Sequence, residues 1–199
     1  MICDLLDIHP MTADQLVRYG YFPTRKNALR RMLKLVRTKR IRQCPPVLLH
    51  KQGRPENVYC RWQPKHDNLR HEVLLTEFLL PFKDAQIVRG YDVRHDLRPD
   101  AVMTLFGQEY LVEMDTGSMS YRDILRKRFS KYEQFGGIVL WVCLTETRKE
   151  GLRSRAERVR HNALFTTLFA HLTEPFGGVW IDYDGQIASV EKHEEKTGA

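Results

Sequence analysis

After residue 66, short strand-like runs alternate with helical patterns along the chain. The elements are, in order, a helix over 67–82, strands over 87–93, 100–106 and 109–115, a helix, a strand over 138–144, an arginine-rich helix from about 148 into 172, and a strand over 179–183. This αβββαβαβ order predicts a mixed α+β or α/β sandwich whose middle strands are covered on both faces.

The first 65 residues have a different pattern. Thr12 precedes a short helical segment that ends at Gly20, and Thr24 is placed to cap a second helix. That second helix has one apolar face, made of Ala28, Leu29, Met32, Leu33 and Val36. Two strand-like stretches follow, with Gly53-Arg54-Pro55 as the turn between them. Helices followed by a basic hairpin are the order of a winged helix-turn-helix domain, so we expect domains at 1–65 and 66–199.

The charge distribution separates the same two parts. Residues 1–65 hold 14 Lys and Arg against 4 Asp and Glu, a net charge of +10. Residues 66–199 hold 18 and 21, a net charge of −3. A concentrated positive charge is typical of proteins that bind a polyanion, so double-stranded DNA is the expected partner, with RNA or a protein as the alternatives.

In a winged helix, the second helix of the pair enters the major groove and the wing lies over the backbone. Arginine pairs with guanine and asparagine with adenine through two hydrogen bonds each. The predicted DNA-binding residues are Arg25, Lys26, Asn27, Arg30 and Lys34 on the helix and Arg54 in the turn. A solvated basic helix face is the alternative interpretation.

Three acids lie near one end of the strand pair 100–106 and 109–115. Asp100 begins the first strand, and Glu113 and Asp115, one residue apart, share a face of the second. A two-residue turn joins the strands, so we expect the three carboxylates to converge. Their repulsion is relieved by a divalent cation, and oxygen ligands suit Mg²⁺ or Mn²⁺. A solvated strand end with unrelated acids is the other interpretation.

The helix after Asp115 has an apolar face that includes Arg128, with Lys131 at its margin. An arginine aimed at the sheet needs an anionic partner, which the acids would supply; the alternative is that it reaches past its neighbours to solvent. His71 with Glu72 or Glu77 is a further candidate ligand set, or else a packed histidine.

Pro99-Asp100 followed by Glu113-Met-Asp115 within an αβββαβ core resembles the PD-(D/E)XK nuclease-like superfamily. The basic N-terminal part, His71, Arg-Pro-Asp at 98–100, Val-Glu-Met-Asp-Thr-Gly-Ser at 112–118 and Tyr132 are together similar to the replication-relaxation family of bacterial mobile elements. The resemblance covers nearly the whole chain. It implies a restriction-endonuclease-like fold and a role in plasmid replication, relaxation or transfer.

The resemblance also implies a Mg²⁺-dependent DNA endonuclease in which Asp100 and Glu113 hold metal, Asp115 assists, and Arg128 or Lys131 stabilises the phosphate charge. Superfamily members that cut DNA usually carry lysine where this chain has Asp115. Arginine is a poor substitute as a proton acceptor because it stays protonated. A non-catalytic transcriptional or replication regulator is therefore the alternative function. A homodimer and replication or transfer proteins are left open as partners.

Four cysteines are scattered without zinc-binding spacing, so no zinc is expected. Cys44 and Cys60 would face each other across the hairpin, as reduced thiols rather than a disulfide. Arginines 148, 153, 155, 158 and 160 form either a second phosphate-contacting surface or a solvated face. No apolar run approaches the roughly 18 residues of a membrane span and no secretory signal is recognised, so a cytoplasmic protein is expected.

Overall fold

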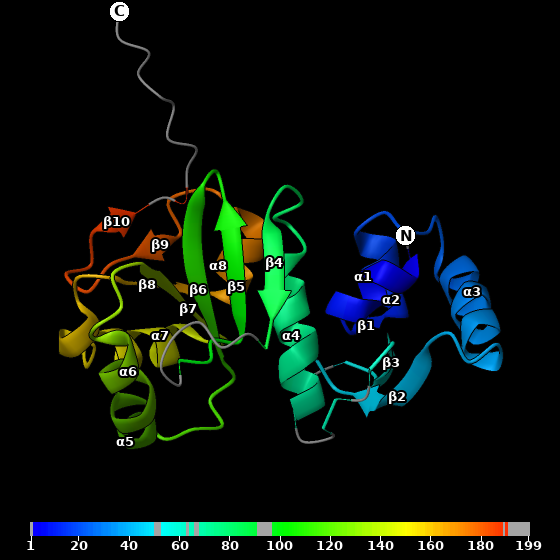
Figure 1. Ribbon diagram of the computed structural model, residues 1–199, viewed down its shortest axis with the longest axis horizontal. Coiled ribbons are helices and arrows are strands. Elements are labelled where there is room, and N and C mark those ends of the chain that lie inside the picture. The colour runs from blue at the N-terminus through cyan, green and yellow to red at the C-terminus, as the bar shows by residue number, and fades with distance from the viewer. Residues whose placement is uncertain are drawn as a thin grey trace, which may run out of the picture. The chain divides into compact units, whose positions relative to one another are not determined.

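The structure, a computed structural model, describes residues 2–49, 53–62, 64–65, 68–90, 97–188 and 190 (Figure 1). The chain divides into two compact units, Met1–Leu80 and Pro81–Ala199, each a mixture of helices and strands. The domain boundary predicted from the charge distribution falls after Lys65, whereas the structure divides the chain after Leu80, so the helix between these positions belongs to the first unit. In the described part of the chain, no helix is long and apolar enough to cross a lipid bilayer.

Four helices belong to the first unit: α1 (Ile2–Ile8), α2 (Ala13–Arg18), α3 (Arg25–Arg37) and α4 (Leu69–Leu79). Both predicted caps are confirmed. The Thr12 hydroxyl accepts from the backbone N–H of Gln15 (3.2 Å), and the Gln15 side chain accepts in return from the N–H of Thr12 (2.9 Å). The Thr24 hydroxyl accepts from the N–H of Asn27 (3.2 Å), which fixes the start of α3.

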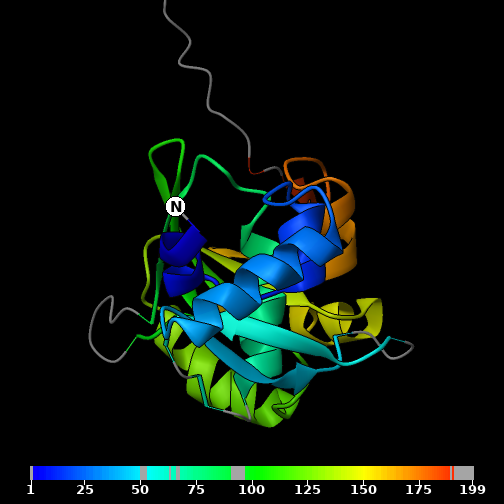
Figure 2. The same cartoon turned by 90° about the vertical axis from the view of Figure 1, so that its right-hand side faces the viewer.

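The sheet of the first unit has three antiparallel strands in the order β1 (Met11–Thr12), β3 (Glu56–Cys60), β2 (Arg42–Val47). The predicted hairpin is thus present, and its ribbon can be followed beside α3 in Figure 2. Its ladder is irregular between Cys44 and Pro46, where the pairing shifts. Gly53, Arg54 and Pro55 are described, whereas residues 50–52 lie outside the described part.

The predicted apolar face of α3 is partly wrong. Ala28, Met32 and Leu35 are buried against α1 and α2, whereas Leu33 is 44% exposed. Positions 28, 32 and 35 follow the i, i+4, i+7 spacing of one stripe, and residue 33 lies about 100° around the helix from residue 32. Leu33 therefore shares the solvent-facing side of α3 with the basic residues.

The second unit is built on a seven-stranded sheet in the order β10-β9-β8-β7-β6-β5-β4. The strands are β4 (Gln86–Arg89), β5 (Ala101–Leu105), β6 (Gln108–Asp115), β7 (Ile138–Cys143), β8 (Ala163–Thr167), β9 (Trp180–Ile181) and β10 (Ile187–Ala188). β4, β5 and β6 pair antiparallel and lie side by side in Figure 1, whereas β6, β7 and β8 pair parallel. The three strands predicted before the helix are confirmed, except that residues 91–93 lie outside the described part.

The helical segments of the second unit are α5 (Tyr121–Ile124), η2 (Leu125–Phe129), α6 (Ser130–Tyr132), α7 (Glu146–Arg153), η3 (Glu157–Val159) and α8 (Leu168–Thr173). The first three form one continuous helical stretch with a π turn at η2. The single helix predicted from about residue 148 into 172 is wrong, because β8 interrupts it. Ala163, Phe165 and Thr167 are buried within the sheet, and the β-branched and aromatic residues of this stretch favour a strand.

The core of the second unit lies between the sheet and these helices. Phe129 and Tyr132 pack edge-on against Trp141 of β7, with ring centroids 4.9 and 5.8 Å apart. Both aromatic side chains come from the helix predicted to lie on the sheet, and both are buried. This packing holds Arg128, which directly precedes Phe129, against the strand that carries Glu113.

Candidate functional site

Glu113 and Asp115 project from the same face of β6, and both are buried in the sheet's covered side, with 4% and 7% of their surfaces exposed. Asp100 precedes β5 and is half-buried. Its backbone N–H donates to the carbonyl of Val112 (3.0 Å), and its side chain accepts from the N–H of Met114 (2.8 Å). The hairpin therefore brings Asp100 beside the end of β6, as its length predicts.

Glu113 is held by two donors from the helical stretch that covers it. One of its oxygens accepts from Nη1 of Arg128 (3.1 Å) and from the hydroxyl of Tyr132. Arg128 also donates to the carbonyl of Arg98 (3.1 Å). The guanidinium thus points at the sheet, as the first of the two interpretations of Arg128 expects.

Asp100 and Glu113 both influence the charge of the Arg128 guanidinium. Burial alone would lower the pKa of the Arg128 guanidinium, but the negative charges of Glu113 and Asp100 outweigh it and raise the pKa. Burial and then the charge of Glu113 raise the pKa of the Tyr132 phenol. At neutral pH the Arg128 guanidinium is therefore charged and the Tyr132 phenol is neutral.

Asp115 has a partner of its own. Arg148, in the first turns of α7, donates from Nε (2.5 Å) and Nη2 (3.2 Å) to the two carboxylate oxygens. The backbone N–H of Gly117 adds a third donor (2.9 Å). Arg148 also donates to the carbonyl of Met119 (2.6 Å) and stacks over the ring of Tyr121, with 4.3 Å to its centroid. This two-point arginine–carboxylate pair is almost completely removed from water.

The three acids as arranged do not fit a Mg²⁺ or Mn²⁺ centre. Donors within the unit bind one oxygen each of Asp100 and Glu113 and both oxygens of Asp115. The guanidinium groups of Arg128 and Arg148 supply the positive charge that a metal would otherwise bring. In the described residues, no three His, Cys, Asp or Glu side chains gather around one point where an ion would fit.

Lys131, the other residue predicted to stabilise the phosphate charge, is exposed on α6.

The pairing of Arg148 with Asp115 was not predicted from the sequence. The sequence groups Arg148 with the other arginines as either a phosphate-contacting surface or a solvated face, but it pairs with Asp115 inside the unit. The signal was available in the topology: β6 and β7 are parallel with Asp115 beside Cys143, so the first turn after β7 lies next to Asp115.

Two of the four remaining arginines in this stretch, Arg153 and Arg160, also pair with acids of the same unit. Arg153 binds Glu150 (2.8 Å) and the carbonyl of Tyr183 (2.7 Å), and Arg160 lies 3.4 Å from Asp184. These contacts favour the interpretation of a charged face stabilised by its own acids.

In the first unit, Glu77 of α4 is a buried acid with several partners from α2. It accepts from Nε2 of Gln15 (2.5 Å), from Arg18, and from the hydroxyl of Tyr19 (3.4 Å). Burial and then the charge of Glu77 raise the pKa of Tyr19. The Nδ1 atom of His71 lies 3.9 Å from Glu72. The contacts of Glu77 fasten α4 to the helices before it, a role the sequence did not indicate.

Three of the predicted DNA-binding residues, Lys26, Arg30 and Lys34, recur every four residues and so share one side of α3. Lys26, Arg30 and Lys34 are exposed, and no Asp or Glu in the described part pairs with any of them. Arg54 is exposed as well.

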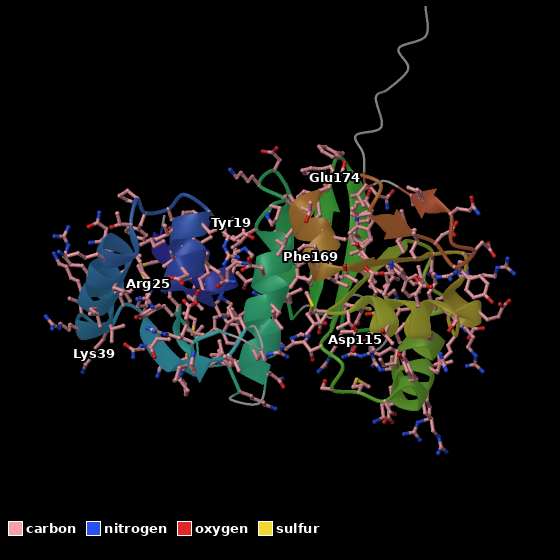
Figure 3. All side chains as sticks on the ribbon, turned by 180° about the vertical axis from the view of Figure 1, so that it is seen from behind. Tyr19, Arg25, Lys39, Asp115, Phe169 and Glu174 are labelled. Carbon is pink, nitrogen blue, oxygen red and sulfur yellow. The ribbon has the colours of Figure 1, made fainter. Side chains whose placement is uncertain are left out.

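The other two predicted residues have contacts within the unit. Arg25 is tied to Asp14 of α2 (2.6 Å), and Asn27 is half-buried with its N–H bound to Thr24. Figure 3 shows Arg25 at the start of α3 and Lys39 just beyond its end, so the basic surface runs the length of the helix.

No protein-family model, curated protein or solved structure matches this chain.

Proposed function

We propose that the protein binds double-stranded DNA through its first unit, acting as a winged helix with α3 as the recognition helix. The order of α1, β1, α2, α3 and the β2–β3 hairpin, with β3 between β1 and β2, supports this assignment. The resemblance to the replication-relaxation family extends the proposal to a role in replication, relaxation or transfer of a mobile element.

The observation that carries the proposal is the row of unpaired cations on α3. Lys26, Arg30 and Lys34 stand on the exposed side of a helix capped and packed by its opposite side. In the described part of the chain no acid neutralises them, so their charge is available to phosphates. Leu33, exposed among them, offers an apolar contact of the kind that reads a thymine methyl.

For the second unit we propose a PD-(D/E)XK-like fold without nuclease activity. The helix, three antiparallel strands and parallel strands after the next helix support that fold. The acids at the expected catalytic positions form internal ion pairs, Glu113 with Arg128 and Asp115 with Arg148. This favours the regulator over the Mg²⁺-dependent endonuclease as the protein's function.

The test is the affinity of the full chain for a fluorescein-labelled DNA duplex, measured by fluorescence anisotropy. The double variant Arg30→Ala/Lys34→Ala is expected to weaken binding by roughly tenfold or more, because two phosphate-facing charges are lost. The matched control removes two charges from the second unit, in Arg122→Ala/Arg126→Ala, and should change the affinity little. Equal losses in both double variants would show that net charge alone, and not α3, governs binding.

A further inference from the structure

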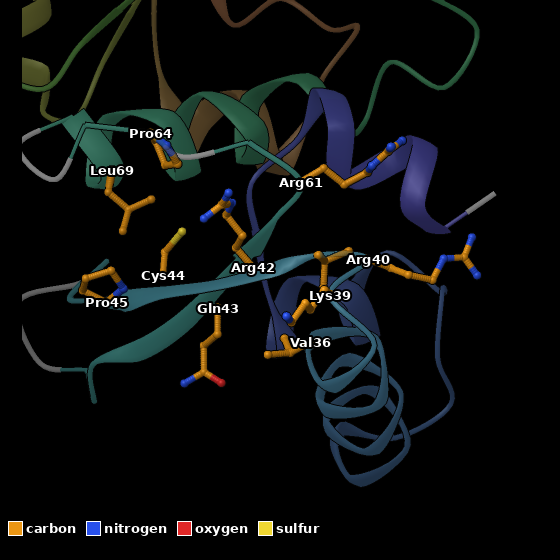
Figure 4. A pocket seen from close by; sticks show the side chains of 11 residues that line it. Val36, Lys39, Arg40, Arg42, Gln43, Cys44, Pro45, Arg61, Pro64 and Leu69 are labelled. Atoms are coloured by element: carbon orange, nitrogen blue, oxygen red, sulfur yellow. The ribbon is translucent and has the colours of Figure 1, made fainter.

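A basic pocket of about 690 Å³ lies within the first unit, between the end of α3, the start of β2 and the residues after β3. Lys39, Arg40, Arg42 and Arg61 line it, and Asp and Glu are absent from its described lining. Arg61 also pairs with Asp7 outside the pocket lining. Figure 4 shows Arg42 and Cys44 on the same stretch of β2, with both side chains directed into the pocket.

Cys44 is one of two thiols that meet at this wall. Its sulfur lies 3.3 Å from the sulfur of Cys60 on β3, and both residues are buried and unbonded. Cys60 is also within 2.8 Å of the carbonyl of Trp62. In the ladder, Cys44 pairs with Val58 and Cys60 with Arg42, so the two cysteines are diagonal neighbours across the hairpin. The expected meeting of these thiols is therefore confirmed.

The two thiols differ in their readiness to ionise. The hydrogen bond with Cys60, and then the charge of Arg42, lower the pKa of Cys44 to about 7 against the opposing effect of burial. The same hydrogen bond, and then burial, raise the pKa of Cys60. Cys44 is thus the thiolate that attacks, and Cys60 the protonated partner. The third buried thiol, Cys143, has its pKa raised to about 12 by burial and the charge of Asp115.

We propose that Cys44 is a redox modification site that reacts with small anionic disulfides, such as oxidised glutathione, and that Cys60 converts the product into a Cys44–Cys60 disulfide. The Cys44 thiolate attacks one sulfur of the small disulfide, forms a mixed disulfide, and releases one small thiolate. Cys60 then attacks the Cys44 sulfur, gives its proton to the departing second small thiolate, and closes the internal bond. Two protein thiols are oxidised, and one small disulfide is reduced to two thiols.

Three structural features together support this two-step oxidation of Cys44 and Cys60. The cationic pocket attracts an anionic reagent and stabilises the attacking thiolate. The second thiol is already within van der Waals distance of the first. The irregular pairing after Cys44 gives β2 room for the shift that brings the sulfurs from 3.3 Å to a bonded distance of about 2.05 Å. The reaction requires only the first unit's hairpin, so it stands independently of DNA binding.

The primary test uses the reduced full-length wild type, treated with oxidised glutathione at pH 7, alkylated and digested for mass spectrometry. A peptide pair linked through Cys44 and Cys60 is the expected product, with Cys143 alkylated only after unfolding. At pH 7, Cys44 should react about five- to tenfold faster than an ordinary thiol, since greater ionisation outweighs the lower intrinsic nucleophilicity. Recovery of both cysteines as alkylated thiols, or of a stable mixed disulfide on Cys44, would overturn the proposal.

Variants separate the two steps. Cys60→Ser should accumulate the mixed disulfide at Cys44, and Cys44→Ser should leave Cys60 unmodified. Cys143→Ser is the matched control and should form the linked pair as the wild type does. If Cys44→Ser forms a disulfide between Cys60 and another cysteine as fast as the wild type forms its linked pair, Cys44 is not the attacking thiol.

The charge of the pocket is tested by comparing oxidised glutathione, which is anionic, with cystamine, which is cationic. The wild type should prefer the anionic reagent severalfold, and Arg42→Gln should reduce that preference. If the ratio of the rate with oxidised glutathione to the rate with cystamine is the same in wild type and Arg42→Gln, the charge of the pocket does not select the reagent. Circular dichroism of each variant establishes that the hairpin unit is folded.

Discussion

Replacing Asp115 with asparagine should destabilise the second unit strongly, because the carboxylate is one half of a buried ion pair. The side chains of Asp115 and Arg148 are only 6% and 15% exposed, and two guanidinium nitrogens donate to the two carboxylate oxygens. Removing one charge leaves the other buried and without compensation, which costs about 3–5 kcal/mol. A carboxylate held among other acids for a metal would behave in the opposite way, since its loss relieves repulsion.

The assay is urea unfolding followed by tryptophan fluorescence, since Trp141 and Trp180 are buried in the second unit. Arg148→Met and the double variant complete the cycle, and the double variant should lose less stability than the sum of the single losses by about 1–3 kcal/mol. The matched control is Asp123→Asn, which breaks a solvent-exposed pair with Lys127 and should cost far less stability than Asp115→Asn. A stability for Asp115→Asn within about 0.5 kcal/mol of wild type, or above it, would refute the reasoning.

Three further outcomes are expected. Leu35→Ala should lose about 2–5 kcal/mol in urea unfolding and Leu33→Ala less than about 0.5, because only the first side chain is buried; similar losses would contradict the buried stripe of α3. Supercoiled plasmid incubated with Mg²⁺ or Mn²⁺ should remain intact with wild type, Asp100→Ala and Glu113→Ala alike, whereas nicking by wild type alone would establish a nuclease. Stability should fall as the pH rises above about 10, because the unfolded Tyr132 phenol then ionises while its raised pKa keeps the folded one protonated; Tyr132→Phe should flatten this fall, and an unchanged slope would contradict the assignment.

Short-range sequence features predicted much of the fold. The hydroxyls of Thr12 and Thr24 predicted the starts of α2 and α3, because a side-chain acceptor before an apolar stripe satisfies the free N–H groups of a helix. A two-residue turn predicted the pairing of β5 and β6 and hence the approach of Asp100 to Glu113. Its predicted position, Gly107-Gln108, is wrong by one residue, because Gln108 pairs with Leu105 and the turn residues at positive φ are Phe106 and Gly107. These features depend on residues close together in the sequence.

Features that depend on distant partners were not predicted. The arginines at helical spacing before β8 favour a helix across it, whereas its own residues and its pairing beside β7 in the sheet make it a strand. The sequence predicts either a phosphate contact or a solvated position for Arg148, because its partner, Asp115, lies 33 positions away in the sequence. Glu77 likewise binds Gln15 and Arg18 across some sixty positions. Charge patterns along one helix do not reveal such pairs.

DNA recognition by α3 is tested most directly by the salt dependence of duplex binding, compared between wild type and Arg30→Ala/Lys34→Ala. For wild type, the logarithm of the affinity should fall linearly and steeply with the logarithm of salt concentration between about 50 and 200 mM. The double variant should bind more weakly with a slope smaller by about 2, one for each phosphate contact removed. A flat response in wild type, or identical slopes for the two proteins, would contradict DNA binding through this helix.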